Sequence, residues 1–330
     1  MMVVFLSTFS PMAMLFFCIA IGFLLSKANI FSDSASSVMA KLETWVFCPA
    51  LGFMTMVRYC TVDSFATHAS NILLATAMVL IAMAIAIILS RFFVKENGPE
   101  RGVYKYALAF ANSGYVGDPI VLALFGESAL AYYKFFCLPL SLVIYTWGIS
   151  VLTPNDAAKG SAFKRLLNPP TIATLCGIVM GLLGIGNYLP EFLVLSLDSL
   201  KACMGPIAML LAGVTVARYD FWGMLKNKKV YLATFLRLIV LPTVLVSAVF
   251  GIKSLLGAMF DISIGNDVLF LCFFANATPL GLNTIVFPAA YGGNPKTGAS
   301  MTMVSHVLCV ITIPLMYAIM VAIFGTPFTA

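Results

Sequence analysis

Ten long apolar stretches, separated by short polar turns, constrain this chain more than any other feature of its sequence. Their approximate bounds are 5–28, 34–57, 69–93, 102–125, 129–152, 169–187, 193–217, 229–256, 267–291 and 297–324. A helix needs about 20 mainly apolar residues to cross the hydrocarbon core of a bilayer. With 61% hydrophobic residues, 10% charged residues and a mean hydropathy of +1.01, the chain is typical of an all-α polytopic membrane protein.

The ten stretches divide into two halves of five, which we predict at residues 1–153 and 169–330. Because each half holds an odd number of spans, the second half enters the membrane from the opposite side, and the repeat is inverted. Residues 154–168 join the halves and are rich in turn-forming residues, which indicates a short cytoplasmic linker.

The string Phe-Ala-Asn occurs twice, at 110–112 and at 274–276, and each copy is followed five residues later by a glycine. Each copy also has a proline nearby, Pro119 and Pro279, and proline removes a hydrogen bond from a helix interior. Paired interruptions at corresponding places in two halves indicate a substrate site at the membrane midplane. We therefore expect the fourth and ninth helices to be broken.

Two broken helices whose N-terminal ends meet can bind an anion such as a carboxylate, because these ends carry unpaired N–H groups and partial positive charge. The substrate-binding residues predicted here are Asn112, Ser113, Gly114, Gly117, Pro119, Asn276, Thr278, Pro279, Gly281, Asn283 and Thr284. The alternative is that the two asparagines bond only each other and hold the crossing closed.

Asp118 and Arg237 are ionisable residues inside predicted spans, and such residues are functional hypotheses by default. Asp118 precedes a proline, so it either caps a half-helix, binds a coupling proton or cation, or forms a salt bridge with a neighbouring helix. Arg237 either snorkels toward the inner surface, pairs with Asp118 or contacts an anionic substrate. Both are predicted to serve coupling or charge balance.

Other polar and small residues receive structural interpretations. Lys201, Asp198, Glu43 and His306 lie nearer predicted helix ends, where a solvated or interfacial role is expected. The pair Gly177 and Gly181 is spaced for close packing between helices.

The distribution of basic residues predicts the orientation of the chain. If the N-terminus lies outside, fourteen of the 19 Lys and Arg residues fall in cytoplasmic turns. Arg58, Lys134, Lys201 and Lys253 fall outside. The positive-inside rule therefore favours both termini outside, and the net charge of +6 needs no nucleic acid partner.

The sequence offers little for metal, nucleotide or covalent chemistry. Seven of the eight cysteines lie in apolar stretches, and no C-x-x-C pair occurs, so we interpret them as small packing residues. There is neither a phosphate-binding loop nor an H-E-x-x-H motif. No cofactor, metal site, ATP-driven pump or enzyme is predicted.

Several short motifs resemble the auxin efflux carrier family, which includes plant PIN transporters and bacterial malate and malonate permeases. They are Asn112-Ser-Gly-Tyr-Val-Gly-Asp-Pro119, Leu-Asn-Pro-Pro170, Arg237-Leu near Pro242, and Ile313-Pro314-Leu315. The resemblance covers essentially the whole chain. It implies a ten-helix inverted repeat, similar to bile-acid symporters and sodium/proton antiporters, in which the fourth and ninth helices cross.

The same resemblance implies how such a molecule is divided. Helices 1, 2, 6 and 7 would form a scaffold domain that can dimerise, and helices 3–5 and 8–10 a transport domain that moves as an elevator. The short linker is similar to that of compact bacterial members in the plasma membrane. The sequence departs from PIN-type members at Asp118, where an aliphatic residue is common, and at Thr284, which stands where the ninth-helix proline is expected.

From these features we predict a secondary transporter for a small organic anion, a mono- or dicarboxylate such as malate or malonate or an auxin-like acid. Coupling to H⁺ or Na⁺ and a homodimer built through the scaffold are both compatible with this prediction. One alternative is a cation/proton antiporter that uses Asp118. The other is a membrane sensor with the same fold that binds ligand without transporting it.

Overall fold

The computed structural model describes residues 2–32, 34–152, 167–218, 226–281, 283–285 and 295–328. Within these residues the protein is helical and contains no β-strand, only an isolated bridge. Five segments are long and apolar enough to cross a membrane: Ser70–Phe93, Ser113–Leu152, Glu191–Ala217, Lys228–Phe260 and Lys296–Phe324. Most of the predicted linker, 154–168, and the end of the ninth stretch lie outside the described residues.

The first half of the chain begins with a long helix and continues with helices that are interrupted by wider turns. Its elements are α1 (Met2–Lys27), α2 (Ala35–Leu42), η1 (Glu43–Phe47), α3 (Cys48–Tyr59), α4 (Val62–Phe93), α5 (Pro99–Ala109), η2 (Ser113–Gly117), α6 (Asp118–Val143), η3 (Ile144–Gly148) and α7 (Ile149–Leu152). The turns η1, η2 and η3 are π-helical and continue directly into the α-helices that follow them.

The second half has the same character. Its elements are α9 (Pro169–Leu182), the 3₁₀ turn η4 (Ile185–Tyr188), α10 (Glu191–Ala217), α12 (Lys228–Phe235), the π-turn η5 (Leu236–Val240), α13 (Leu241–Phe260), α14 (Asp267–Ala277) and α16 (Pro295–Phe324).

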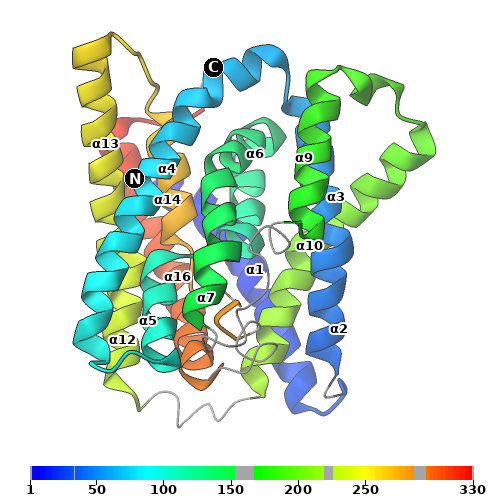
Figure 1. The fold of residues 1–330 in the computed structure, drawn as a ribbon. Coiled ribbons are helices and arrows are strands. Elements are labelled where there is room, and N and C mark those ends of the chain that lie inside the picture. The colour runs from blue at the N-terminus through cyan, green and yellow to red at the C-terminus, as the bar shows by residue number, and fades with distance from the viewer. Residues whose placement is uncertain are drawn as a thin grey trace.

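Most helices pack against neighbours in one of two sets. α1 packs on α10, and α3 packs on both α9 and α10, while α4 packs on α5, α6 and α13, α13 packs on α14, and α12 packs on α16. α1 also packs on α16, and this contact joins the two sets. Figure 1 shows α3 and α9 on one side of the molecule and α4, α12 and α13 on the other, with α6 between them. The site described below lies where these two sides meet.

Glycines allow the closest of these contacts. A Cβ on Gly213 of α10 would lie 2.0 Å from the Ile19 carbonyl oxygen of α1, and one on Gly22 of α1 would lie 2.3 Å from the Leu210 carbonyl oxygen of α10. Likewise Gly177 and Gly181 of α9 lie against the backbone of α3 and of Cys60 just beyond it, which confirms their predicted packing role.

The segment Ser113–Leu152 is divided at Gly126, whose backbone has φ 81° and ψ −175°. This region of backbone conformation is accessible almost only to glycine. The chain therefore reverses at Gly126, in the interval that the sequence predicts between the stretches 102–125 and 129–152.

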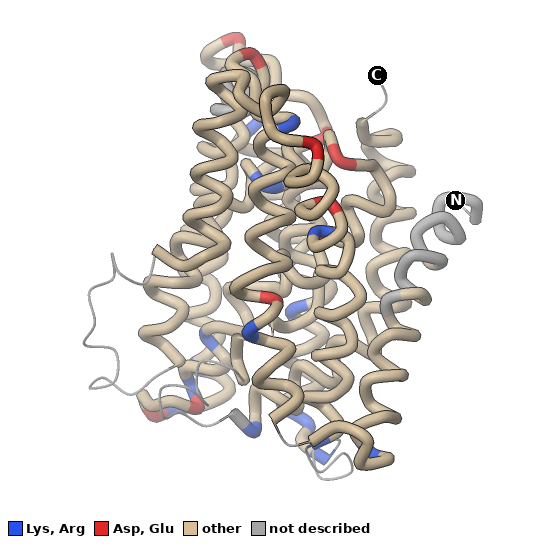
Figure 2. The backbone as a smooth tube through the Cα atoms, turned by 90° about the vertical axis from the view of Figure 1, so that its right-hand side faces the viewer, with Lys and Arg blue, Asp and Glu red and all other residues tan. Residues whose placement is uncertain are grey.

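Charged residues gather toward the two ends of the molecule, and Lys and Arg are most frequent at the lower end in Figure 2.

Four predictions about single residues were wrong. Lys134 was placed at an outer end, but it lies inside the molecule in an ion pair with Asp118. Glu43 and His306, expected at interfaces, are 0% and 3% exposed because they lie on helix faces that pack against neighbours. Lys201, expected in the same setting, is 9% exposed and forms ion pairs with Glu127 and Asp198.

Candidate functional site

The first interruption of a helix lies at residues 110–112. α5 ends at Ala109, Phe110 is extended, and a new helical segment begins at Ser113. The Asn112 carbonyl accepts the N–H groups of Val116 and Gly117, both at 3.1 Å, so Asn112 stands at the N-terminal boundary of the new segment. The predicted break is confirmed, but the capping role considered for Asp118 is wrong, because the five residues before it are already helical.

The second interruption follows Ala277, the last residue of α14. Thr278 is extended there, and the chain is helical again at residues 283–285. The two unwound segments bond each other: the Asn112 N–H donates to the Pro279 carbonyl at 2.8 Å, and Ala111 and Leu280 form an antiparallel bridge. Unwound backbone inside a membrane needs such partners, because no water is present to supply them.

Arg237, in η5, contacts the ends of both interrupted helices. Its guanidinium donates to the Leu108 carbonyl at 3.3 Å and to the Asn276 carbonyl at 2.6 Å, in the last turns of α5 and α14. Helix C-termini carry partial negative charge and unpaired carbonyls, which a cation satisfies. The side chain is 2% exposed and neither snorkels nor pairs with Asp118, so the described contacts are those of a C-terminal cap.

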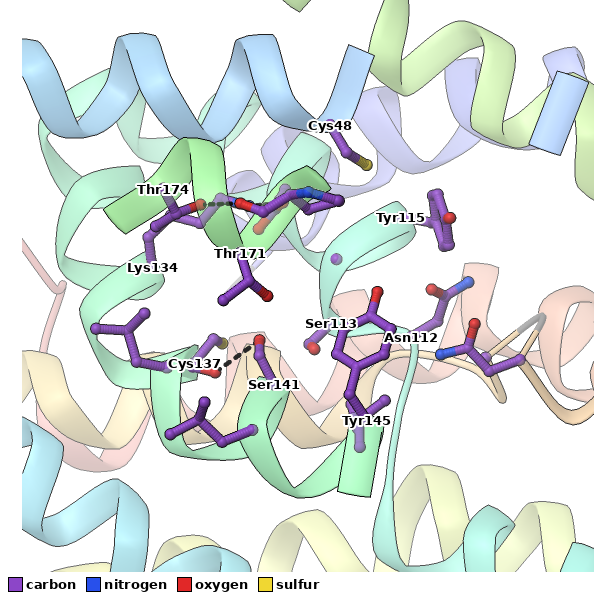
Figure 3. A pocket seen from close by; sticks show the side chains of 18 of the residues that line it. Cys48, Asn112, Ser113, Tyr115, Lys134, Cys137, Ser141, Tyr145, Thr171 and Thr174 are labelled. Carbon is purple, nitrogen blue, oxygen red and sulfur yellow. Dashed lines mark hydrogen bonds and ion pairs between the residues drawn. The ribbon is translucent and has the colours of Figure 1, made fainter. Parts of the chain in front are cut away.

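A cavity of about 270 Å³ lies beside the first interruption. Asn112, Ser113 and Tyr145 stand on one side of it, and Lys134, Thr171 and Thr174 on the other (Figure 3). The cavity thus lies between the start of the broken helix and α9. Its remaining wall includes Cys48 of α3, Cys137 and Ser141 of α6, and Gly281 and Asn283 from the second interruption.

Asn112 places an unpaired hydrogen-bond donor in the wall of this cavity. The residue is 4% exposed, it lines the cavity, and its side-chain amide nitrogen has no partner among the described residues. A buried polar group without a partner costs free energy, so an occupant that accepts this hydrogen bond would bind more tightly.

Asp118 and Lys134 form an ion pair in the cavity wall. They lie on opposite sides of the reversal at Gly126, so the pair joins two neighbouring helices, which is one of the roles considered for Asp118. Asp118 is 2% exposed, and a buried carboxylate is tolerated when a cation compensates its charge.

The cavity brings together only part of the predicted set. Asn112, Ser113, Gly114, Asp118, Gly281 and Asn283 line it. Gly117, Pro119, Asn276, Thr278, Pro279, Thr284 and Arg237 do not. A Cβ on Gly117 would lie 2.2 Å from the Tyr133 hydroxyl, and the Thr284 hydroxyl donates to the Gly281 carbonyl at 2.9 Å, so these two have local packing contacts.

The two asparagines of the duplicated string do not bond each other. The Asn276 amide donates to the Cys272 carbonyl at 2.9 Å and contacts the Met78 sulfur at 2.8 Å, away from the cavity. Sequence reasoning also missed Lys134, Thr171, Thr174 and Tyr145 as cavity residues. Of these four, only Lys134 could have been identified from the sequence, because it is a charged residue inside a predicted span, within six residues of its end. Thr171, Thr174 and Tyr145 carry hydroxyl groups, which are too common in helices to indicate a site.

Comparison with known proteins gives matches over nearly the whole chain. The family model described as a membrane transport protein matches residues 7–162 and residues 157–317. An uncharacterized transporter of Methanocaldococcus jannaschii is 22% identical over 219 residues, which are 63% of this chain and 70% of that protein. An uncharacterized transporter of Methanothermobacter thermautotrophicus is 21% identical over 203 residues, which are 60% of this chain and 64% of that protein, just under two thirds of its length.

Proposed function

The chain belongs to the membrane transport protein family, whose members are auxin efflux carrier-like, and from this premise we propose that it is a secondary transporter of a small organic anion. Membership confirms the resemblance drawn from the sequence, and it favours a membrane-embedded transporter over an enzyme. The observation that carries the anion proposal is the buried, unpartnered amide of Asn112, a residue that lines the cavity at the start of a helix.

The electrostatics of the crossing favour an anionic occupant. The negative C-terminal ends of α5 and α14 are compensated by Arg237, and the Asp118 carboxylate is compensated by Lys134. The start of the segment at Ser113 remains, and its partial positive charge is directed at the cavity. A carboxylate would accept from the Asn112 amide and interact with this helix end.

The size of the cavity favours a small substrate. Ligand pockets in proteins commonly measure about 300–1,000 Å³. At about 270 Å³ the cavity lies just below that range. This supports a mono- or dicarboxylate of the size of malate or malonate, or an auxin-like acid, over a larger amphipathic anion.

We further propose the ten-helix inverted repeat and an elevator-type motion. In this arrangement α1, α2–α3, α9 and α10 form the scaffold, and α4–α7, α12–α14 and α16 form the transport domain. The packing of α1 on α10 and of α3 on α9 supports this division, as do the contacts of α4 with α5 and α13. The contact of α1 with α16 would lie on the boundary between the two domains. The cavity has walls from both sets, as a site carried past a scaffold requires. A homodimer through the scaffold is part of the same proposal.

The orientation proposed is N- and C-termini outside in a bacterial inner membrane. The concentration of basic residues at one end of the molecule supports it (Figure 2).

Asp118 supports a second candidate function, a cation/proton antiporter. Its carboxylate lies in the cavity wall, where a cation that displaced Lys134 could be bound. In that case sodium or proton flux occurs without any organic anion. A sensor would bind the anion without transporting it, so a transport assay distinguishes it from both the anion carrier and the antiporter.

The test is counterflow of labelled malate and malonate in proteoliposomes, with native protein, Asn112→Ala and the matched control Asn97→Ala in the exposed turn after α4. A hydrogen bond to a charged group contributes about 1.5–3 kcal/mol, so Asn112→Ala should weaken apparent affinity by about tenfold or more. Asn97→Ala should match the native protein.

Equal exchange by all three proteins would show that Asn112 does not contribute to the anion site. If none exchanges either acid while sodium or proton flux persists, the antiporter replaces the anion carrier.

A further inference from the structure

The cavity has a second buried acid behind its wall, and the function proposed above does not use it. Glu43 is 0% exposed and lies in the π-turn η1, in the middle of the continuous helix formed by α2, η1 and α3. Oε1 has no partner among the described residues, and Oε2 accepts only a long contact from the Cys48 thiol at 3.9 Å. Cys48 itself lines the cavity.

No cation compensates Glu43 within the described residues. α9 carries no charged residue, and in α10 Lys201 bonds to Glu127 and Asp198 near the opposite end of the helix. Lys41 of α2 is exposed, and it lies two residues before Glu43, a spacing that places the two side chains on different faces of the helix. An ionised carboxylate in such a place is far more costly than a neutral acid.

The titratable groups that face Glu43 belong to the cavity wall. The Cys48 thiol is next to it, and Thr44, the following residue, lies beside the Tyr115 hydroxyl of the cavity. Cys48 is also within electrostatic range of Asp118 and Lys134. Because Asp118 and Lys134 compensate each other, the charge on Glu43 determines whether this wall is neutral or negative.

We propose that Glu43 binds a proton whose presence is linked to anion binding in the cavity. This rests on the proposed function. With the proton bound, Glu43 is neutral and the cavity accepts a carboxylate. When Glu43 releases the proton to water and becomes a carboxylate, it repels the anion through a medium of low dielectric constant. Anion and proton therefore bind together, and their movement is coupled.

The expected size of the linkage follows from Coulomb's law. Two unit charges separated by about one helix diameter, about 10 Å, at an effective dielectric constant of about 20, change a binding constant by on the order of tenfold. The native protein should bind malonate about tenfold more weakly at about pH 9 than at about pH 7, because loss of the proton leaves a negative charge on Glu43, whereas malonate stays a dianion throughout this range.

The experiment measures malonate affinity in detergent across this pH range and proton uptake with malonate in proteoliposomes. Glu43→Gln is permanently neutral, so it should keep the tighter affinity throughout this range and take up no proton with the anion. Glu43→Asp should retain both the pH dependence and proton uptake. Glu96→Gln, the same change in an exposed turn, should behave like the native protein.

A native pH dependence and native proton uptake in Glu43→Gln would overturn the proposal. The proposal would also be overturned if Glu43→Gln were folded but bound malonate at no pH, because the proposal assigns malonate binding to the neutral form of residue 43. An infrared band of a protonated carboxyl, present in the native protein and absent in Glu43→Gln, tests the protonation without any substrate; its absence from the native protein also overturns the proposal. Failure of the native protein to exchange any acid while the band is present would instead overturn the anion function.

Discussion

Asn112 and Asn276 occupy the same place in a duplicated string, yet their surroundings differ. The string is offset relative to the two breaks: α5 ends at Ala109, before Asn112, whereas α14 ends at Ala277, after Asn276. Asn112 therefore begins a new helical segment and faces the cavity, while Asn276 belongs to the last turn of the old helix and packs inside. The repeat predicted both breaks, but a shift of a few residues decides which asparagine can meet a ligand.

Arg237 shows a second limit of sequence reasoning at the scale of one residue. Its partners are two backbone carbonyls, one from each half of the chain. A sequence reveals charged side chains as partners, but every residue has a carbonyl, so nothing marked Leu108 or Asn276 in advance. The sequence predicted that Arg237 lies deep in the membrane. It could not predict the capping role, because that role depends on where α5 and α14 end in the structure.

We expect Arg237→Gln to reduce the free energy of unfolding, because two hydrogen bonds from a cation are lost and each contributes about 1.5–3 kcal/mol. Arg237→Lys should lose less, since an ammonium group can still reach one carbonyl. Thermal unfolding in detergent measures both, with Arg91→Gln, an exposed matched change, as the control. If Arg237→Gln unfolds like the native protein but loses anion affinity, Arg237 contacts the substrate instead.

At the scale of elements, π-turns carry much of the site. η1 holds Glu43, η2 holds Ser113 and Tyr115, η3 holds Tyr145, and η5 holds Arg237. Such turns are rare in helices and occur often at functional sites, because the extra residue redirects a side chain. The sequence predicted the spans that contain these turns from their apolar length, but a π-turn has no compositional signal. The direction of these side chains was therefore not predictable.

The contact between α1 and α10 provides a prediction about helix packing. Gly213→Ala adds a Cβ 2.0 Å from the Ile19 carbonyl oxygen, so the helices must move apart, at a cost of about 1–3 kcal/mol. Gly251→Ala in α13 is the matched control, because its Cβ would have no neighbour within 4 Å, and alanine favours a helix. Thermal unfolding should show a lower midpoint for the first variant and an equal or higher one for the second. Equal midpoints for both would mean that α1 and α10 do not approach this closely.

At the scale of the whole molecule, the charge distribution has consequences for topology. Glu96 lies in the turn after α4, at the end where basic residues gather, and Tyr188, which is 84% exposed, lies in η4. A membrane-impermeant maleimide should label Tyr188→Cys in intact cells and Glu96→Cys only after the membrane is permeabilised, with the native protein as the blank. The reverse pattern would contradict the proposed orientation.

Composition predicted the helical membrane protein, and the duplicated string predicted where two of its helices are interrupted, although the first break lies before Pro119 and not at it. The sequence could not predict which residues of other spans surround those interruptions. Lys134 meets Asp118 only because the chain reverses at Gly126, and Thr171 and Thr174 reach the cavity only because α9 begins beside it. These contacts depend on how distant spans are placed together, for which apolar residues carry almost no information.

The hydrogen bond between the Asn112 N–H and the Pro279 carbonyl also bears on how the molecule is made. During synthesis the first interrupted helix enters the bilayer long before residue 279 has left the ribosome. Until then the unwound backbone around Ala111 lacks its bridge to Leu280, and an unsatisfied backbone group costs several kcal/mol in hydrocarbon. We therefore expect the first interruption to be completed only when the second half of the chain has been inserted beside it.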